Sequence, residues 1–335
     1  MVTDKLQRVF RDLRISVTDR CNFRCAYCMP EEIYGEKYKF LSKDRLLTFE
    51  EITRLIRIFV NLGAVKIRLT GGEPLLRKDV ELLVGQLAKI EGIEDFAMTS
   101  NGYLMPQKAQ ILKDAGLHRL TVSLDSLDDD VFRQMNGNKA GVKQVLEGIE
   151  TAAQAGLTPI KINAVVQRGV NDHTIVDLAR YCKERGYILR FIEYMDAGNL
   201  NGWKLEHVVP AAEMVAMVSA EMPLEAIDSN YHGEVARRYK YRDGDGEVGL
   251  ITSVTNAFCG GCTRLRLSPE GRIYTCLFGI EGIDLRQPLR FGANDDEIAN
   301  IITNTWKKRT DRYSELRAEL PDSDKPKVEM HHIGG

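Results

Sequence analysis

The sequence predicts an α/β fold, namely an incomplete (β/α)6 TIM-type barrel with a C-terminal extension. Short segments of strand character alternate with helical patterns six times before residue 196, and the alternation then breaks into turn-rich sequence. Repeated strand and helix units favour a parallel sheet with helices packed on its outside. We therefore expect a partial barrel over residues 1–196 and a second region over residues 197–335.

The six expected strands span residues 13–18, 65–70, 95–99, 119–124, 160–165 and 189–193. The helix that begins after Thr48 carries a capping box, because Thr48 can accept from the Glu51 amide while the Glu51 side chain reaches back. Gly63 then offers a C-terminal stop for that helix. Beyond residue 196 we expect short strands near 235–241 and 264–267 and a helical tail from about Asp295.

The expected strands are apolar on one face and polar on the other, whereas buried parallel strands are usually apolar throughout. Arg14, Arg68 and Lys161 lie on the polar faces of the first, second and fifth strands. If the apolar faces meet the helices, these cations line the barrel interior. Buried cations are costly without partners, so such an interior should hold an anion or water. The alternative is an open sheet with one solvated face.

The composition is that of a globular protein, with 335 residues, 44% hydrophobic residues, 28% charged residues and a formal net charge of -2. This balance gives no broad electrostatic reason to bind nucleic acid or an anionic membrane. Residues 1–10 lack the apolar run of a signal peptide, and no run reaches membrane-spanning length. We expect a cytoplasmic protein whose seven cysteines are metal ligands or free thiols rather than disulfides.

The first cysteine group is Cys21-x3-Cys25-x2-Cys28, directly after the first expected strand. Barrel enzymes place their chemistry at that end of a strand. Three thiolates held this closely can each bind a different iron of one polynuclear core and leave a fourth iron open. A structural zinc site would need a fourth donor, and His118, the nearest histidine, is far along the chain. Chance clustering and a three-cysteine zinc site remain the alternatives.

The second cysteine group is Cys259-x2-Cys262 with Cys276, which again gives three thiolates and encloses Arg264 and Arg266. A zinc knuckle is the alternative here, although no fourth ligand is evident. The seventh cysteine, Cys182, falls on an expected helix, where we interpret it as a small buried hydrophobic residue.

Two motifs resemble those of the radical S-adenosylmethionine (SAM) superfamily. Tyr27 fills the aromatic position of Cys-x3-Cys-x-aromatic-Cys, and Gly71-Gly72-Glu73-Pro74 after the second strand is similar to the methionine-binding segment. The resemblance implies that SAM chelates the open iron of a [4Fe-4S] cluster. The reduced cluster would cleave the sulfonium and release methionine and a 5′-deoxyadenosyl radical.

From about Arg11 to the terminal Gly334-Gly335, the chain resembles the GTP 3′,8-cyclase family of molybdenum cofactor biosynthesis. The resemblance implies a second [4Fe-4S] cluster in the C-terminal extension, on Cys259, Cys262 and Cys276, whose open iron region holds the guanine of GTP. It implies GTP contacts by Arg14, Arg68, Thr99, Lys161, Arg264 and Arg266, and SAM contacts by Tyr27, Gly72, Ser123 and Met195. Catalytic roles would fall to Cys21, Cys25, Cys28, Arg264, Arg266, Gly334 and Gly335.

The implied reaction begins when the radical abstracts hydrogen from C3′ of the GTP ribose. The carbon radical then attacks C8 of guanine, and the product is (8S)-3′,8-cyclo-7,8-dihydroguanosine 5′-triphosphate. The expected partners are GTP, a low-potential electron donor and, downstream in the pathway, cyclic pyranopterin monophosphate synthase, and the chain is a candidate homodimer. No P-loop motif occurs, which favours GTP as substrate rather than energy source.

Two other functions share some of these features. A radical SAM enzyme with an auxiliary cluster that acts on a peptide would also carry both triplets, although such enzymes usually have more cysteines around the second site. A zinc-stabilised, non-enzymatic binding module would be colourless and would not cleave SAM. His331 and His332 could ligate a metal, but near a chain end we expect them to be solvated.

Overall fold

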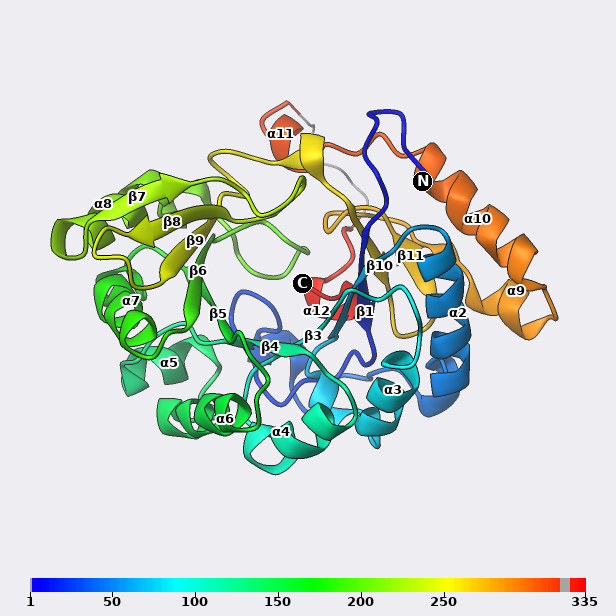
Figure 1. Ribbon diagram of the computed structural model, residues 1–335, viewed down its shortest axis with the longest axis horizontal. Coiled ribbons are helices and arrows are strands. Elements are labelled where there is room, and N and C mark those ends of the chain that lie inside the picture. The colour runs from blue at the N-terminus through cyan, green and yellow to red at the C-terminus, as the bar shows by residue number, and fades with distance from the viewer. Residues whose placement is uncertain (1, 320–325) are drawn as a thin grey trace.

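A computed structural model describes residues 2–319 and 326–335. Its sheet curves around a central space, with most of the longer helices on the outside (Figure 1). The strands are β1 (Asp12–Ser16), β2 (Lys66–Thr70), β3 (Asp95–Ser100), β4 (Arg119–Ser123), β5 (Lys161–Val166), β6 (Ile188–Glu193), β7 (Leu224–Ile227), β8 (Arg237–Tyr241), β9 (Glu247–Ile251), β10 (Arg264–Leu267), β11 (Arg272–Tyr274) and β12 (Ile283–Asp284). Their order is β12-β11-β10-β1-β2-β3-β4-β5-β6-β9-β8-β7.

The strands from β10 to β9 in this order are parallel, and the pairs at both ends are antiparallel. All six predicted strands are present within a residue or two of their expected bounds. The sheet also continues past residue 196, because β9 pairs with β6 and β10 pairs with β1. Since β7 and β12 are at opposite ends of the order, the described strands form a partial barrel of the TIM type rather than a closed one.

The helices that follow the strands cover the outer face of the sheet. They are α2 (Phe49–Asn61), α3 (Val80–Leu87), α4 (Met105–Asp114), α5 (Asp129–Met135), α6 (Val142–Gln154) and α7 (Ile175–Glu184), with α8 (Ala211–Glu221) and α10 (Asp295–Lys307) further along the chain. Shorter helices are α1 (Glu31–Tyr34), α9 (Arg286–Arg290), α11 (Tyr313–Leu316) and α12 (Met330–Ile333). None of the described helices has the length and apolar character needed to cross a membrane.

The local signals that predicted these elements work as expected. Thr48 accepts a hydrogen bond from the Glu51 amide, and the Glu51 side chain accepts from the Thr48 amide at 2.8 Å. Gly63 follows the end of α2 with φ of +115°, a conformation that glycine adopts without strain. Cys182, predicted to be a buried hydrophobic residue, is 1% exposed on α7.

The alternation of polar and apolar residues separates the core from the interior of the sheet. Leu13 and Ile15 of β1 and Ile67 and Leu69 of β2 are buried in one hydrophobic core with the helices. The polar residues between them point the other way, where they line a cavity. The open, solvated sheet face considered as an alternative is therefore wrong, and the apolar burial on the helical side holds the polar faces inward.

Candidate active site

The N-terminal cysteine loop leaves the carboxyl end of β1. A tight turn closes it, since the amides of Cys28 and Met29 both donate to the Cys25 carbonyl oxygen, at 2.9 and 2.7 Å. Cys21, Cys25 and Cys28 are free of disulfides. Burial raises the pKa of all three thiols, and for Cys21 it reaches about 12 with a further contribution from Glu73. The thiolates of this loop therefore need a compensating positive charge, which a metal cluster would supply.

The Gly71-Gly72 segment after β2 packs directly on this loop. The Gly72 amide donates to the Thr18 carbonyl oxygen at 2.9 Å, and a Cβ added at Gly72 would overlap the Arg20 carbonyl oxygen. Gly71 has φ of +147° against the backbone of Thr18. Glycine is required where two backbones approach this closely, so the two motifs form one unit at the carboxyl ends of β1 and β2.

Glu73 and Asp125 are buried carboxylates beside the N-terminal cysteines. Glu73 accepts from the Ser100 hydroxyl at 2.9 Å and from the Asn101 amide at 2.7 Å, which ties the glycine segment to the end of β3. Burial raises the pKa of Glu73 to about 7 and that of Asp125 to about 6. Asp125 accepts from the Tyr27 hydroxyl at 2.9 Å. Asp125 lies just after the end of β4, and no sequence motif singles it out.

A cavity with an empty volume of about 1710 Å³, part of it open to solvent, lies inside the curved sheet. Its lining includes every residue predicted to contact GTP, namely Arg14, Arg68, Thr99, Lys161, Arg264 and Arg266, and also Tyr27, Met195, Gly335, Cys259, Cys262 and Cys276. The predicted residues outside this lining are Cys21, Cys25, Cys28, Gly72, Ser123 and Gly334. Ser123 ends β4 and is half-buried. The cavity thus brings the second triplet and the predicted substrate contacts together.

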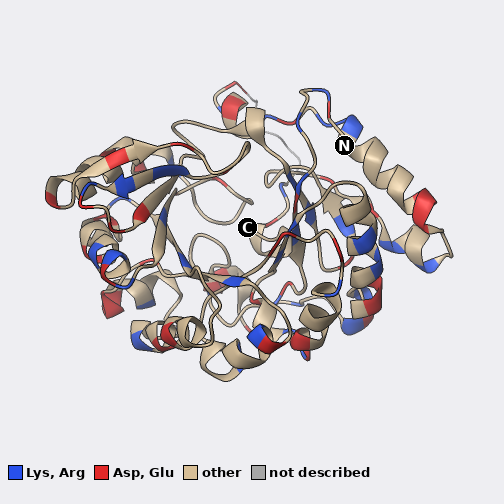
Figure 2. Cartoon of the chain, viewed as in Figure 1, with Lys and Arg blue, Asp and Glu red and all other residues tan. Residues whose placement is uncertain are grey.

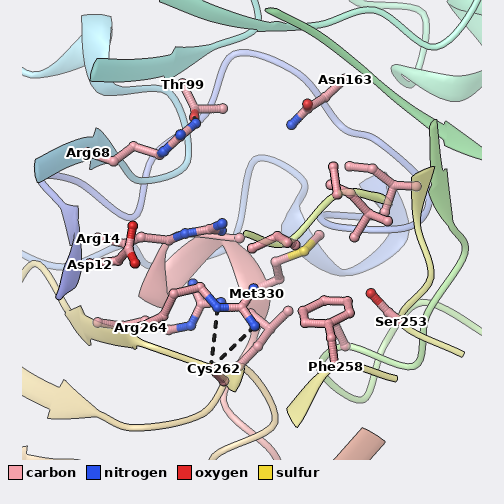
Figure 3. A pocket seen from close by; sticks show the side chains of 18 of the residues that line it. Asp12, Arg14, Arg68, Thr99, Asn163, Ser253, Phe258, Cys262, Arg264 and Met330 are labelled. Carbon is pink, nitrogen blue, oxygen red and sulfur yellow. Dashed lines mark hydrogen bonds between the residues drawn. The ribbon is translucent and has the colours of Figure 1, made fainter. Parts of the chain in front are cut away.

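The cavity is crowded with cations that repel one another. Figure 3 shows Arg14, Arg68 and Arg264 extending into it from separate strands. Burial, followed by the charges of neighbouring arginines, lowers the pKa of Arg14, takes that of Arg68 to about 10 and takes that of Lys161 to about 8. Figure 2 shows Lys and Arg on these inner strands as well as on the outer helices. A bound polyanion would relieve this repulsion, so the cavity fits a phosphate-bearing ligand.

Among the other polar residues of the cavity lining, sequence reasoning did not assign Lys66, Asn163 and Arg190. Lys66 is on β2, Asn163 is on β5 and Arg190 is on β6. Burial and the charges of Arg68 and Arg119 lower the pKa of Arg190 to about 9. Two side-chain atoms, Asn163 Oδ1 and Arg190 Nε, are buried without a hydrogen-bond partner. Such buried groups are usually paired, so both atoms suit contacts with a ligand.

The second cysteine triplet lies at the amino end of β10, because Cys259 and Cys262 precede that strand and Cys276 follows the antiparallel strand β11. A short turn joins two of its members, because the Cys262 amide donates to the Cys259 carbonyl oxygen at 3.1 Å. The Cys262 sulfur accepts from Arg309 Nη2 at 3.1 Å and from Arg264 Nη2 at 3.3 Å (Figure 3 shows the Arg264 contact). Burial disfavours the Cys262 thiolate, but the two guanidinium groups outweigh it and lower the pKa to about 6. Burial raises the pKa of Cys276 to about 11.

The donor sets of the two triplets suit a polynuclear cluster better than a single metal ion. Among residues 2–319 and 326–335, no group of three or more His, Cys, Asp and Glu side chains converges to hold a single metal ion. Each triplet instead offers three soft sulfur donors free of disulfides. Cys21, Cys25 and Cys28 share one loop, whereas Cys259 and Cys262 precede β10 and Cys276 follows β11. A [4Fe-4S] cluster spaces its thiolate ligands over separate irons, so both triplets fit a polynuclear cluster with an open iron.

The C-terminal tail enters the site between the two triplets. Arg266 donates to the Gly334 carbonyl oxygen, and Gly334 has φ of +73° with its Cα facing the Thr70 hydroxyl. Lys327 anchors the start of the tail through Asp196 at 3.0 Å. Gly335 lines the cavity, as does Met330, which Figure 3 places beside Arg14. Gly334 is therefore buried in the fold, whereas Gly335 is exposed at the cavity.

The prediction that His331 and His332 are solvated is wrong. His331 is 3% exposed, its ring packs edge-on to Tyr34 at 4.8 Å between centroids, and burial lowers its pKa to about 3. His332 Nε2 lies 2.8 Å from a carboxylate oxygen of Glu270. The tail is buried by contacts with distant segments, which is why position near a chain end was a poor guide.

Comparison with known protein families first defines the class. Residues 15–182 match the model of the radical SAM superfamily, and residues 187–315 match the model described as Molybdenum Cofactor Synthesis C. The fold is similar to that of Streptococcus suis SuiB bound to S-adenosylmethionine, with a TM-score of 0.63 and 14% identity over 88% of this chain and 68% of that one. At that identity the likeness concerns the fold. The chain is an α/β protein of the radical SAM class.

Comparison with individual proteins then identifies the family within this class. The chain is 49% identical to a protein of Acidothermus cellulolyticus named GTP 3′,8-cyclase, over 100% of this chain and 99% of that one. Proteins of the same name from Xanthomonas axonopodis pv. citri and Staphylococcus carnosus are 48% and 46% identical, each over at least 98% of both chains. The chain belongs to the GTP 3′,8-cyclase family.

Proposed function

We propose that this protein is a radical SAM enzyme that converts GTP to (8S)-3′,8-cyclo-7,8-dihydroguanosine 5′-triphosphate in the first step of molybdenum cofactor biosynthesis. The observation that carries the proposal is the cation-lined cavity between two cysteine triplets, in a chain of this family. The peptide-acting alternative has less support, because the named full-length relatives are GTP 3′,8-cyclases. The zinc module has less support because the described triplets are not closed by a fourth donor.

The N-terminal end of the site binds the first [4Fe-4S] cluster and SAM. Cys21, Cys25 and Cys28 are its ligands, and the bound cluster and SAM together supply a 5′-deoxyadenosyl radical. The contacts to SAM come from Tyr27, Gly72, Ser123 and Met195. Gly72 has a direct structural reason to be a glycine, since the absence of a side chain lets the segment after β2 pack against the backbone of the cysteine loop.

The cavity binds GTP. Arg14, Arg68, Thr99, Lys161, Arg264 and Arg266 are the predicted contacts, and Lys66, Asn163 and Arg190 extend this set. Guanidinium groups pair with phosphate oxygens in bidentate geometry, and lysine supplies a point charge. Arg68 Nη1 is already oriented by the hydroxyls of Thr99 and Thr121 at 3.2 and 3.1 Å. Placement of the ribose near the radical, rather than acid–base chemistry, is the main contribution of these residues.

The C-terminal region, residues 197–335, holds the second [4Fe-4S] cluster on Cys259, Cys262 and Cys276, and residues 1–196 form the partial barrel that generates the radical. With three cysteine ligands, this cluster would leave one iron available to bind the guanine. Gly334 and Gly335 act during cyclisation, and the contact of Gly334 with Arg266 supports this role. The proposal includes a cytoplasmic location, a low-potential electron donor, cyclic pyranopterin monophosphate synthase as the downstream enzyme, and a homodimer.

The proposed function is tested by anaerobic incubation of the reconstituted protein with reductant, SAM and GTP. We expect 5′-deoxyadenosine to form much faster with GTP than without it, because GTP supplies the abstracted hydrogen. ATP in place of GTP is the control, since it carries the same triphosphate and a different base. Equal rates of 5′-deoxyadenosine formation with and without GTP would refute the substrate assignment.

A further inference from the structure

Arg309 follows the end of α10, lines the cavity and reaches the second cysteine triplet. Its side chain is buried, and the residue is 4% exposed. Arg309 Nη1 donates to the Cys262 carbonyl oxygen at 2.8 Å, and Nη2 donates to the Cys262 sulfur at 3.1 Å. One guanidinium group therefore holds both the backbone and the sulfur of the same cysteine.

Arg309 is itself fixed from two sides. Its Nε donates to an Asp311 carboxylate oxygen at 2.7 Å, and its guanidinium lies 4.6 Å from the ring centroid of Trp306. Thr275, the neighbour of Cys276, donates to the other Asp311 oxygen at 2.8 Å. The fork geometry of arginine suits several simultaneous contacts, so Arg309 has little rotational freedom.

Arg8 connects these contacts to Cys259, the remaining cysteine of the second triplet. Arg8 Nη1 donates to the carbonyl oxygens of Cys259 and Asp311, at 3.0 and 2.8 Å. Arg8 forms a buried ion pair with Asp4. The carbonyl oxygen of Arg8 accepts a hydrogen bond from Trp306 Nε1 at 3.0 Å. Segments from both ends of the chain therefore form one buried network around the loops that carry the second triplet.

Arg264 also donates to the Cys262 sulfur, but it is held differently. Its only described acceptor is that sulfur, at 3.3 and 3.4 Å from Nη2 and Nε, and its guanidinium lies 5.0 Å from the Phe258 ring centroid. Among the described residues, no carboxylate lies within ion-pair distance of Arg264. Both arginines line the cavity, but Arg264 has only the Cys262 sulfur as a described acceptor and is free to turn toward a phosphate. Arg309 is not, because Asp311 and the Cys262 carbonyl oxygen also hold it.

We propose that Arg309 is a positioning residue that keeps a hydrogen bond to the Cys262 sulfur throughout turnover and thereby tunes the second cluster, while Arg264 exchanges that sulfur for substrate. The inference rests on the proposed function, since it requires a cluster on the second triplet. Hydrogen bonds to ligand sulfurs stabilise the more negative, reduced form of an iron–sulfur cluster and raise its reduction potential. Loss of the Arg309 contact should lower that potential.

The test uses full-length Arg309→Met, reconstituted anaerobically, with the reduction potentials of both clusters measured by titration followed by electron paramagnetic resonance (EPR). We expect the potential of the second cluster to fall and that of the first cluster to stay at its wild-type value. Arg309→Lys, which keeps the charge but loses the fork, should show a smaller fall. Arg238→Met is the matched control, because it removes another arginine paired with a carboxylate, Glu247, away from the cysteines.

The possible outcomes separate the two proposals. Wild-type protein that binds only about four irons instead of about eight would contradict the second cluster, and with it the proposed function. Two clusters in Arg309→Met with both potentials unchanged would overturn the inference about Arg309 alone. If Arg309→Met cannot hold the second cluster, Arg309→Lys decides: a lowered potential supports the inference and an unchanged one refutes it.

Discussion

The two cysteine triplets offer the same donors in surroundings of opposite charge. The N-terminal triplet lies beside the buried carboxylates Glu73 and Asp125, which together with burial raise the pKa values of its thiols. The C-terminal triplet lies beside the guanidinium groups of Arg264 and Arg309, which lower the pKa of Cys262. The site therefore has an acidic end at the N-terminal triplet and a basic end at the C-terminal triplet.

This difference matches the proposed ligands. SAM carries a sulfonium and an ammonium group, which buried carboxylates stabilise, and GTP carries a triphosphate, which buried arginines stabilise. The acidic end thus favours SAM and the basic end favours GTP. Electrostatics can orient two ligands in this way without any contact between them.

The largest expected effect comes from removing one ligand at the acidic end. Cys25→Ser should abolish 5′-deoxyadenosine formation and reduce the iron content by about four per chain, since a three-ligand cluster does not tolerate the loss of a thiolate. Iron analysis and product chromatography measure both changes. The matched control is Cys182→Ala, which removes a buried cysteine on α7 and should leave the iron content unchanged. Retained SAM cleavage in Cys25→Ser would show that the acidic end is not where the radical forms.

A substitution at the basic end should affect GTP and spare the first cluster. Arg266→Ala removes a charged hydrogen-bond donor worth about 1.5–3 kcal/mol and should weaken GTP binding by about 10- to 100-fold. Isothermal titration calorimetry measures the affinity. Arg272→Ala on the neighbouring strand β11 is the control, because Arg272 bonds to the Gly282 carbonyl oxygen outside the cavity lining. An unchanged GTP affinity in Arg266→Ala would remove Arg266 from the substrate site.

A substitution in the C-terminal tail should have a smaller effect on the reaction. Gly334→Ala forces a side chain into a left-handed backbone conformation, at a cost of roughly 1–2 kcal/mol, and against Thr70. We expect less cyclised product per 5′-deoxyadenosine, with SAM cleavage retained. Gly169→Ala has nearly the same φ, +74° against +73°, with no atoms near the added Cβ, so it controls for backbone strain alone. An equal product ratio in both variants would exclude a catalytic role for the tail.

The smallest predicted effect is a pH dependence of GTP binding. Burial and the nearby cations Arg190, Arg119 and Arg68 lower the pKa of Lys161 to about 8, against a weaker opposing effect of Glu234. Lys161 is therefore charged below pH 8 and loses its proton as the pH rises through that value, whereas bound phosphate favours the protonated form. GTP affinity should fall a few-fold between about pH 7 and pH 9. Calorimetry at both pH values should show a flatter dependence for Lys161→Arg, and an identical slope would contradict the assignment.

Much of the fold and part of the site followed from local patterns. The period of two along each strand fixed which residues face inward, and so placed Arg14, Arg68 and Lys161 in the cavity before any coordinates. The same period of two did not predict an inward position for Arg190, because its face of β6 is otherwise formed by Ile188 and Ile192. A single cation on an otherwise apolar face does not predict a polar cavity lining.

Other features depend on contacts between segments far apart in the chain. Arg309 lies 47 residues from Cys262 and has no motif near it, so its role is visible only in three dimensions. The pairing of β9 with β6 and of β10 with β1 extends the expected six-stranded barrel for the same reason. The burial of His331 against Tyr34 reversed an expectation based on chain position.

The central claim is that SAM binds at the acidic end and GTP at the basic end, each at its own cluster. The most direct measurement is EPR of the reduced protein in two triple variants, one with Cys21, Cys25 and Cys28 replaced by alanine and one with Cys259, Cys262 and Cys276 replaced. GTP should alter the cluster spectrum only when the second triplet is intact, and SAM only when the first is intact. A spectrum from the first triplet alone that responds to GTP, or one from the second that does not, would contradict the account.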